Sequence, residues 1–146
     1  MNVTDVIRLY GEPIRFNHEQ TTDTLTYESF ILSTKTESVA GKQQSTLTFF
    51  STDTSTFCFL SDTFPEGVKV GTRLADLQNF NFVKTKTGRG DPANAIQYIP
   101  SGDKTYPFLK KKANYILFGN NTQYYILAIE DGKVAEWAMA TRPSKP

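Results

Sequence analysis

The sequence predicts an α+β protein in which short helices and antiparallel β-hairpins form one curved antiparallel sheet. Residues 114–140 alternate as three strands joined by tight turns. Two short segments, near 4–10 and 71–80, carry apolar residues at near-helical spacing. The second half of the chain also matches the first when it is shifted by 68 positions, so that Thr72 falls on Thr4. This offset predicts a tandem repeat of one helix-plus-hairpin unit.

The strongest β signal is the three-strand meander. Tyr115 to Phe118 is a β-branched and aromatic run, and the following Gly119-Asn120-Asn121 tolerates the positive φ of a hairpin turn. Gln123 to Ile129 is apolar on both faces, which predicts a central or covered strand. The Asp131-Gly132 pair predicts a second hairpin, followed by a last strand at 134–139. On that strand we expect one face to hold Ala135, Trp137 and Met139, and the other to hold Val134, Glu136 and Ala138.

The remaining elements follow in chain order. An N-cap at Thr4-Asp5 predicts a helix of about two turns, which Gly11-Glu12-Pro13 ends. A strand is expected at 24–32, a long polar hairpin loop at 33–45, and a hairpin of strands 46–50 and 54–60. The second helix is expected within 68–82, with Leu74, Leu77 and Phe80 on its apolar face. A basic loop at 83–91 and a strand at 94–99 then lead to the meander.

The repeat defines the expected domain organisation. Residues 47–50 fall on 115–118 and residues 56–62 fall on 124–130, with apolar and turn classes in agreement. We therefore expect a single domain over 1–146, built of two similar units at about 1–64 and 69–140. Residues 141–146 are expected to form a frayed tail.

Composition excludes several classes of function. A net charge of +1 indicates neither nucleic acid nor an anionic membrane as a partner, and the basic residues at 84–112 predict a solvated or acid-partner face. One cysteine excludes an intramolecular disulfide and a cysteine-based zinc site. No apolar run is long enough to span a bilayer. As written, the chain carries no leader, which predicts the cytoplasm; the alternative is a periplasmic protein or lipoprotein whose leader has been removed.

No group of residues predicts catalysis, a metal site or a cofactor. His18 beside Glu19 is expected to be an exposed loop histidine rather than an acid or base. Cys58, between Phe57 and Phe59, is expected to be buried and inert rather than a nucleophile. We therefore expect a protein that is not an enzyme.

The helix ending in Leu9-Tyr10-Gly11-Glu12-Pro13, followed by antiparallel strands in a repeated unit, resembles the β-lactamase-inhibitor-protein-like fold. The bacterial outer-membrane assembly lipoproteins of the BamE type resemble a single such unit. This resemblance implies a binding surface on a curved sheet and no catalysis. The inhibitor proteins carry a disulfide in each repeat, and Cys58 alone cannot form one, which argues against inhibition of a β-lactamase.

The sequence thus predicts a non-enzymatic protein-binding module, inhibitory or assembly-related, that uses an aromatic-rich sheet face. The aromatic content of 13% supports a contact surface beyond what a core needs. The alternative is a small-molecule or lipid carrier that uses the concave sheet face. The expected partner-binding residues are Tyr98, Tyr106, Tyr115, Tyr124, Trp137, Lys110, Lys111 and Lys112, although about half of these rings are expected to fill the core.

Overall fold

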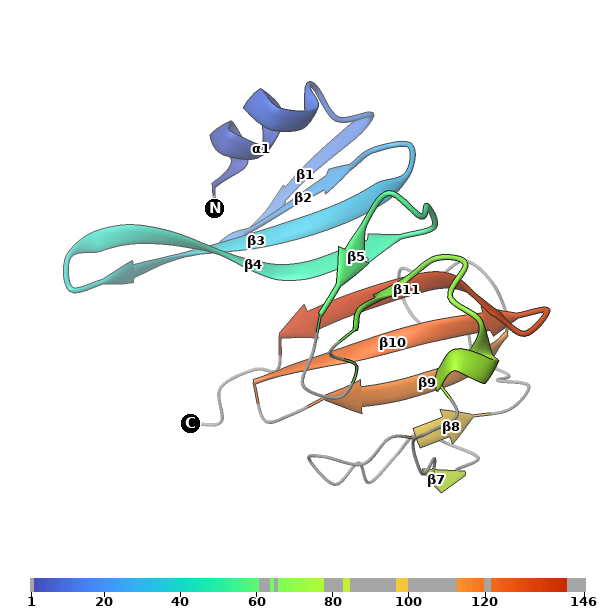
Figure 1. Cartoon of the computed structure of the whole chain (residues 1–146). Helices are drawn as coiled ribbons and strands as arrows, with labels where there is room; N and C mark the ends of the chain where they lie inside the picture. Colours follow the sequence, from blue (N-terminus) through green and yellow to red (C-terminus); the bar gives the residue numbers. More distant parts are fainter. Residues whose placement is uncertain are drawn as a thin grey trace. The chain divides into compact units, whose positions relative to one another are not determined.

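A computed structural model describes residues 2–60, 64, 66–77, 83–84, 97–99, 113–119 and 122–141; at 83–84 and 97–99 it describes the backbone alone. The described chain is mostly antiparallel sheet with one α-helix, which agrees with the α+β prediction at that level. It divides into two compact units, Met1–Phe50 and Ser51–Pro146 (Figure 1).

The first unit begins with helix α1 (Val3–Tyr10), close to where the sequence predicts it. The side chain of Asn2 caps the helix, because its Oδ1 accepts a hydrogen bond from the backbone N–H of Asp5 at 2.9 Å. At the other end, Gly11 has φ of 81° and donates its N–H to the carbonyl of Ile7 at 2.8 Å. Val6 is the fully buried residue of the helix. The N-cap is therefore Asn2 rather than Thr4 or Asp5.

Four strands follow in the first unit, in the order β1-β2-β3-β4. They are β1 (Arg15–Glu19), β2 (Thr22–Thr26), β3 (Phe30–Val39) and β4 (Lys42–Thr52), and β4 runs across the division between the units. The predicted single strand at 24–32 is wrong. Tyr27 donates its N–H to the carbonyl of Phe30 at 2.8 Å, which turns the chain between β2 and β3.

The predicted hairpin loop at 33–45 is too long, because all of these residues except the turn form the two arms of the β3–β4 hairpin (Figure 1). Ala40 and Gly41 form its turn with φ of 52° and 78°. The arms near the turn are exposed and rich in Thr, Ser and Lys, so no apolar alternation marks them. Threonine suits an extended backbone, and Thr36 Oγ1 and Ser45 Oγ form a hydrogen bond of 2.8 Å.

The second unit contains the predicted meander. Strands β9 (Asn114–Gly119), β10 (Gln123–Glu130) and β11 (Lys133–Thr141) are antiparallel, with β10 in the centre. Asp131 and Gly132, with φ of 53° and 74°, form the expected turn. Both faces of β10 are buried from Tyr125 to Ile129, which confirms the prediction of a central, covered strand.

The faces of β11 differ from the prediction because the strand carries a β-bulge. The pairing passes from Ala128–Glu136 to Ile129–Val134 and leaves Ala135 without an opposite residue. Paired residues share a face, so Val134 lies on the same face as Trp137 rather than on the opposite one.

The other elements of the second unit are short. Strands β5 (Cys58–Phe59) and β6 (Val68–Lys69) pair antiparallel, and β7 (Val83–Lys84) and β8 (Gln97–Ile99) continue the sheet order β11-β10-β9-β8-β7, with β7 and β8 parallel. The expected strand at 54–60 shrinks to β5. The expected second helix is only the 3-10 helix η1 (Leu74–Leu77), and residues 78–82 lie outside the described residues.

Backbone hydrogen bonds explain why no α-helix starts at Gly71-Thr72. Gly71 donates to the carbonyl of Val134 at 2.8 Å, and Val134 donates to that of Thr72 at 2.9 Å. Leu74 donates to the carbonyl of Gly132 at 2.8 Å. These bonds pair the segment with the start of β11, so the same backbone groups are not free to form α-helical hydrogen bonds. The repeat at an offset of 68 is not confirmed and stays a prediction.

Candidate protein-binding surface

Among the described residues of the second unit, most aromatic rings build its core. Phe59 stacks on Tyr125 at a centroid distance of 4.4 Å and lies 4.7 Å from Trp137. Phe118 stacks on Tyr125 at 5.1 Å, and Phe64 meets Phe118 edge-on at 4.8 Å. All five rings are buried. The short β5–β6 hairpin therefore covers one face of the meander with Phe59.

This packing decides where the expected partner-binding residues lie. Tyr115 is fully buried and Trp137 is 4% exposed, so both belong to the core and present no ring to a partner. Tyr124 is half-buried on β10. Only the backbone of Tyr98 is described, in β8. Tyr106, Lys110, Lys111 and Lys112 lie outside the described residues.

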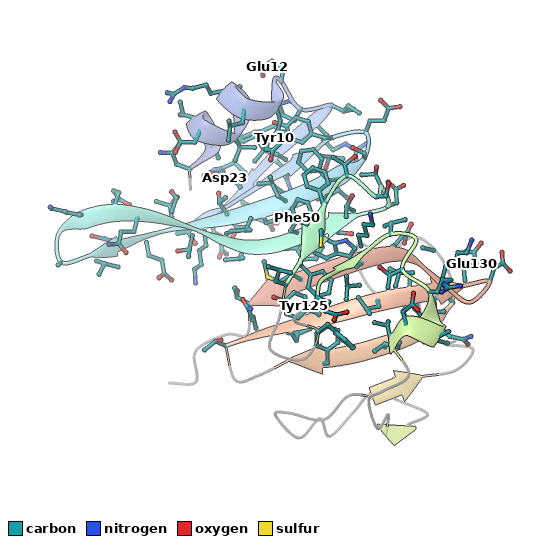
Figure 2. All side chains as sticks on the ribbon, in the orientation of Figure 1. Tyr10, Glu12, Asp23, Phe50, Tyr125 and Glu130 are labelled. Atoms are coloured by element: carbon teal, nitrogen blue, oxygen red, sulfur yellow. The ribbon has the colours of Figure 1, made fainter. Side chains whose placement is uncertain are left out.

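The first unit holds a second aromatic cluster beside the end of α1. Tyr27 stacks on Phe30 at 4.6 Å, and Phe50 stacks on the same ring at 5.7 Å. Tyr10 meets Phe30 edge-on at 5.1 Å (Figure 2). The hydroxyl of Tyr27 donates a hydrogen bond of 2.8 Å to the carbonyl of Gly11. Burial and the neighbouring Glu12 and Tyr10 raise the pKa of Tyr27 above its ordinary value.

Beside this cluster, several large apolar side chains are exposed to solvent. We name this stretch, residues 9–16, the exposed apolar segment. Leu9 is 68% exposed, Tyr10 46%, Ile14 72% and Phe16 49%. They span the end of α1 and the start of β1, and the underlying ring cluster fixes one of them, Tyr10. Single exposed apolar residues are ordinary, whereas several in one short segment indicate a contact surface.

Strand β1 adds an open backbone edge to the same region. All five of its residues are exposed, and it lies at the end of its unit's strand order, paired with β2 alone among the described residues. Two bonds fix which backbone groups face outward: Thr36 N–H to the Thr21 carbonyl and Tyr27 N–H to the Phe30 carbonyl. Odd-numbered residues of β2 therefore bond to β3, and even-numbered ones bond to β1.

The partners of those even-numbered residues on β1 are Arg15, Asn17 and Glu19. The backbone groups of the residues between them, Phe16 and His18, therefore point away from β2. Such an edge is a template for pairing with another strand.

Catalytic and metal chemistry gain no support from the described residues. No group of three or more His, Cys, Asp or Glu side chains among them could hold a metal ion. His18 is exposed as expected, but it lies on β1 rather than in a loop, and its Nδ1 contacts Oδ1 of Asp23 on β2. Cys58 is exposed, so the prediction of a buried thiol is wrong; on β5 it is the neighbouring Phe59 that points into the core. No helix of the described chain is long and apolar enough to cross a membrane.

No local sequence pattern predicted β1 or the exposed apolar segment. Arg15-Phe16-Asn17-His18-Glu19 has one strongly apolar residue, and the turn at Gln20-Thr21 lacks glycine and asparagine, although Gln20 adopts φ of 54°. The available signal was the concentration of large apolar residues directly after a helix-stop motif. A helix of two turns can bury only one stripe of side chains against the core, so apolar residues outside that stripe stay exposed.

The resemblance to the β-lactamase-inhibitor-protein-like fold can be set beside comparisons with known proteins. No family model, curated protein or solved structure matches this chain. The resemblance therefore stays a prediction, and the candidate site rests on the geometry of α1 and β1.

Proposed function

We propose that this chain is a non-enzymatic protein-binding module, inhibitory or assembly-related, whose contact surface is the exposed apolar segment. One observation carries the proposal: Leu9, Tyr10, Ile14 and Phe16 expose large apolar side chains within one short stretch. Covering this area removes apolar surface from water, which favours association by roughly 25 cal/mol per Å² before the entropic cost of binding. This surface replaces Tyr115 and Trp137 as contact residues, because both of their rings are buried.

Structural support for the surface comes from its rigidity. The ring of Tyr10 is held by its edge-on contact with Phe30, and the carbonyl of Gly11 accepts a hydrogen bond from the Tyr27 hydroxyl. A preorganised surface loses little conformational entropy when a partner binds. Arg8, Glu12 and Arg15 flank the apolar residues and supply a polar rim of both charge signs.

A small-molecule or lipid carrier has less support. The carrier would need an open apolar face on the sheet, but Phe59, Phe64 and Trp137 fill one face of the meander. Three further parts of the proposal concern the whole protein. They are the tandem repeat of two units in one curved sheet, a cytoplasmic location, and the absence of a nucleic-acid partner. A net charge of +1 and mixed charges around the surface support the last of these.

The test compares two matched substitutions. Ile14→Asp places a charge in the exposed apolar segment, whereas Leu60→Asp places one on an equally exposed leucine of the second unit. Proteins captured by the native chain from lysate of its source organism are identified, and their affinities are measured with purified proteins. We expect Ile14→Asp to weaken the specific partner by tenfold or more, about 1.4 kcal/mol, and Leu60→Asp to leave it unchanged.

Circular dichroism of both variants shows whether they keep the native fold. If every captured protein binds the Ile14→Asp and native chains equally, the exposed apolar segment is not the contact surface.

A further inference from the structure

We propose that two copies of this chain pair antiparallel along the open edges of their β1 strands, about a two-fold axis at Asn17. The proposal goes beyond partner binding by the exposed apolar segment and does not depend on it. It rests on the backbone geometry of β1 and on the order of the side chains along that strand.

Backbone geometry limits how a second strand can add to β1. Only Phe16 and His18 direct their N–H and C=O groups away from β2, so these residues must form the new hydrogen bonds. In a pairing of β1 with itself, Phe16 can oppose Phe16, His18 can oppose His18, or Phe16 can oppose His18. When Phe16 opposes His18, both residues of each copy form backbone hydrogen bonds with the other copy. In each of the other two registers, only one residue of each β1 strand does so.

The side chains select the same register. When Phe16 opposes His18 of the second copy, Arg15 opposes Glu19 of the second copy, and Glu19 opposes Arg15. Both ends of the strand pair then join opposite charges, which stabilises directly opposed residues on adjacent strands. The shifted registers place Arg15 or Glu19 opposite Asn17. A parallel, in-register pairing would place like charges together.

The central residues also fit this arrangement. Asn17 meets Asn17 of the second copy on the axis, and Phe16 meets the imidazole of His18. That imidazole is held by its contact with Asp23 across the β1–β2 pair. The five residues of β1 are exposed, and none is proline, so nothing in the strand removes an outward N–H. The charge order makes the edge complementary to itself, which favours a second copy over an unrelated strand.

Charge reversal tests the pairing without altering the fold. Arg15 and Glu19 are four residues apart on one strand, about 13 Å, which exceeds the Debye length of about 8 Å at physiological salt. The two charges therefore couple weakly within one copy, but they lie opposite each other between copies. Arg15→Glu gives a strand with two acidic ends, and Glu19→Arg gives one with two basic ends.

The measurement is sedimentation velocity over a range of concentrations. We expect the native chain to move from its monomer mass of 16.4 kDa to twice that mass as concentration rises through the range of about 10 μM to 1 mM, because the interface is small. Each variant alone is expected to associate about tenfold more weakly, since two opposed pairs per dimer become repulsive. An equimolar mixture is expected to recover association as a heterodimer.

Lys42→Glu is the matched control, because it reverses one exposed charge elsewhere in the same unit and is expected to leave association unchanged. A native chain that stays monomeric at about 1 mM overturns the proposal. So does a native dimer that both β1 variants form equally well. A mixture that associates no better than its separate components overturns the antiparallel register.

Discussion

At the scale of single residues, Tyr27 joins the end of α1 to the sheet of the first unit. Its hydroxyl donates to the carbonyl of Gly11, and its ring stacks on Phe30. Burial first, and then the charges of Glu12 and Tyr10, raise the pKa of Tyr27 above its ordinary value of 10.0. The folded state therefore retains the phenolic proton at a pH where the unfolded chain has begun to lose it.

Tyr27→Phe removes both the hydrogen bond and this titration. We expect the free energy of unfolding to fall by about 0.5–1.5 kcal/mol at about pH 7. Because the folded pKa is raised, the stabilisation by the Tyr27 hydroxyl is complete below about pH 10 and is lost as the pH rises through the folded pKa. Urea unfolding of the native chain and of the Tyr27→Phe variant, from about pH 7 to about pH 11, should give a difference that is constant at first and then shrinks. A difference that does not change with pH would contradict this assignment.

Cys58 illustrates how one residue step reverses burial on a strand. Phe59 is buried on β5, so its neighbour Cys58 faces out and is exposed. A thiol reagent should therefore label Cys58 in the native protein within a few-fold of its rate in the unfolded chain. Protection by more than about a hundredfold would show that the side chain is covered. Cys58→Ser, the unlabelled control, should change the free energy of unfolding by less than about 0.5 kcal/mol, as at other exposed sites.

At the scale of elements, the bulge in β11 aims Trp137 into the core. It leaves Ala135 without an opposite residue, so that Val134 and Trp137 share the face that Phe59 covers. Trp137 is 4% exposed and opposes the fully buried Leu127 of β10. The strand is therefore held by one large ring on its inner face.

Trp137→Ala should lower the free energy of unfolding by roughly 3–5 kcal/mol, because it leaves a large cavity under Phe59. Lys133→Ala, at an exposed position of the same strand, should change it by less than about 0.5 kcal/mol. Thermal melting followed by far-UV circular dichroism compares the two. Equal melting midpoints for the native chain and the Trp137→Ala variant would place the Trp137 ring outside the core.

At the scale of the whole molecule, the two units have different element orders among the described residues. The first has α1 followed by consecutive hairpins, whereas the second has the β5–β6 hairpin, η1, a parallel pair and the meander. Under the offset of 68, residues 123–130 of β10 correspond to 55–62, of which 55–60 are described and contain the two-residue strand β5 paired with β6. The repeat predicts that residues 1–64 and 69–132 superpose, and an experimental structure of the whole chain tests this.

Charge balance predicts the solubility of the whole molecule. Sixteen Lys and Arg oppose fifteen Asp and Glu, and the isoelectric point is about 7.8. Near this pH the molecules repel one another least, so we expect solubility to pass through a minimum there. Light scattering of concentrated protein between about pH 6 and about pH 10 measures it. A steady rise or fall through pH 7.8 would show that local patches, rather than net charge, govern association.

Local sequence signals were sufficient for the elements whose local and tertiary preferences agree. Helix α1 follows from apolar residues at helical spacing and the Gly11 stop, and the meander follows from apolar alternation and the Asp131-Gly132 turn. Each of these signals lies within about ten residues, and each sets backbone geometry directly. For the candidate site, the sequence marked aromatic content as functional and named Tyr115 and Trp137 among candidates of which about half were expected in the core. Both are core residues, and no local signal separated the core rings from the surface rings.

Burial, register and strand edges required the packed structure. Alternation along β5 predicts that Cys58 and Phe59 point to opposite faces, but it does not say which face is buried. What packs against the strand decides that Phe59 points inward. The segment 71–74 has helical spacing but pairs with β11, since bonds to Gly132 and Val134 satisfy its backbone. The exposure of β1 depends on its place at the end of a strand order, and strand order comes from long-range pairing rather than from any local run of residues.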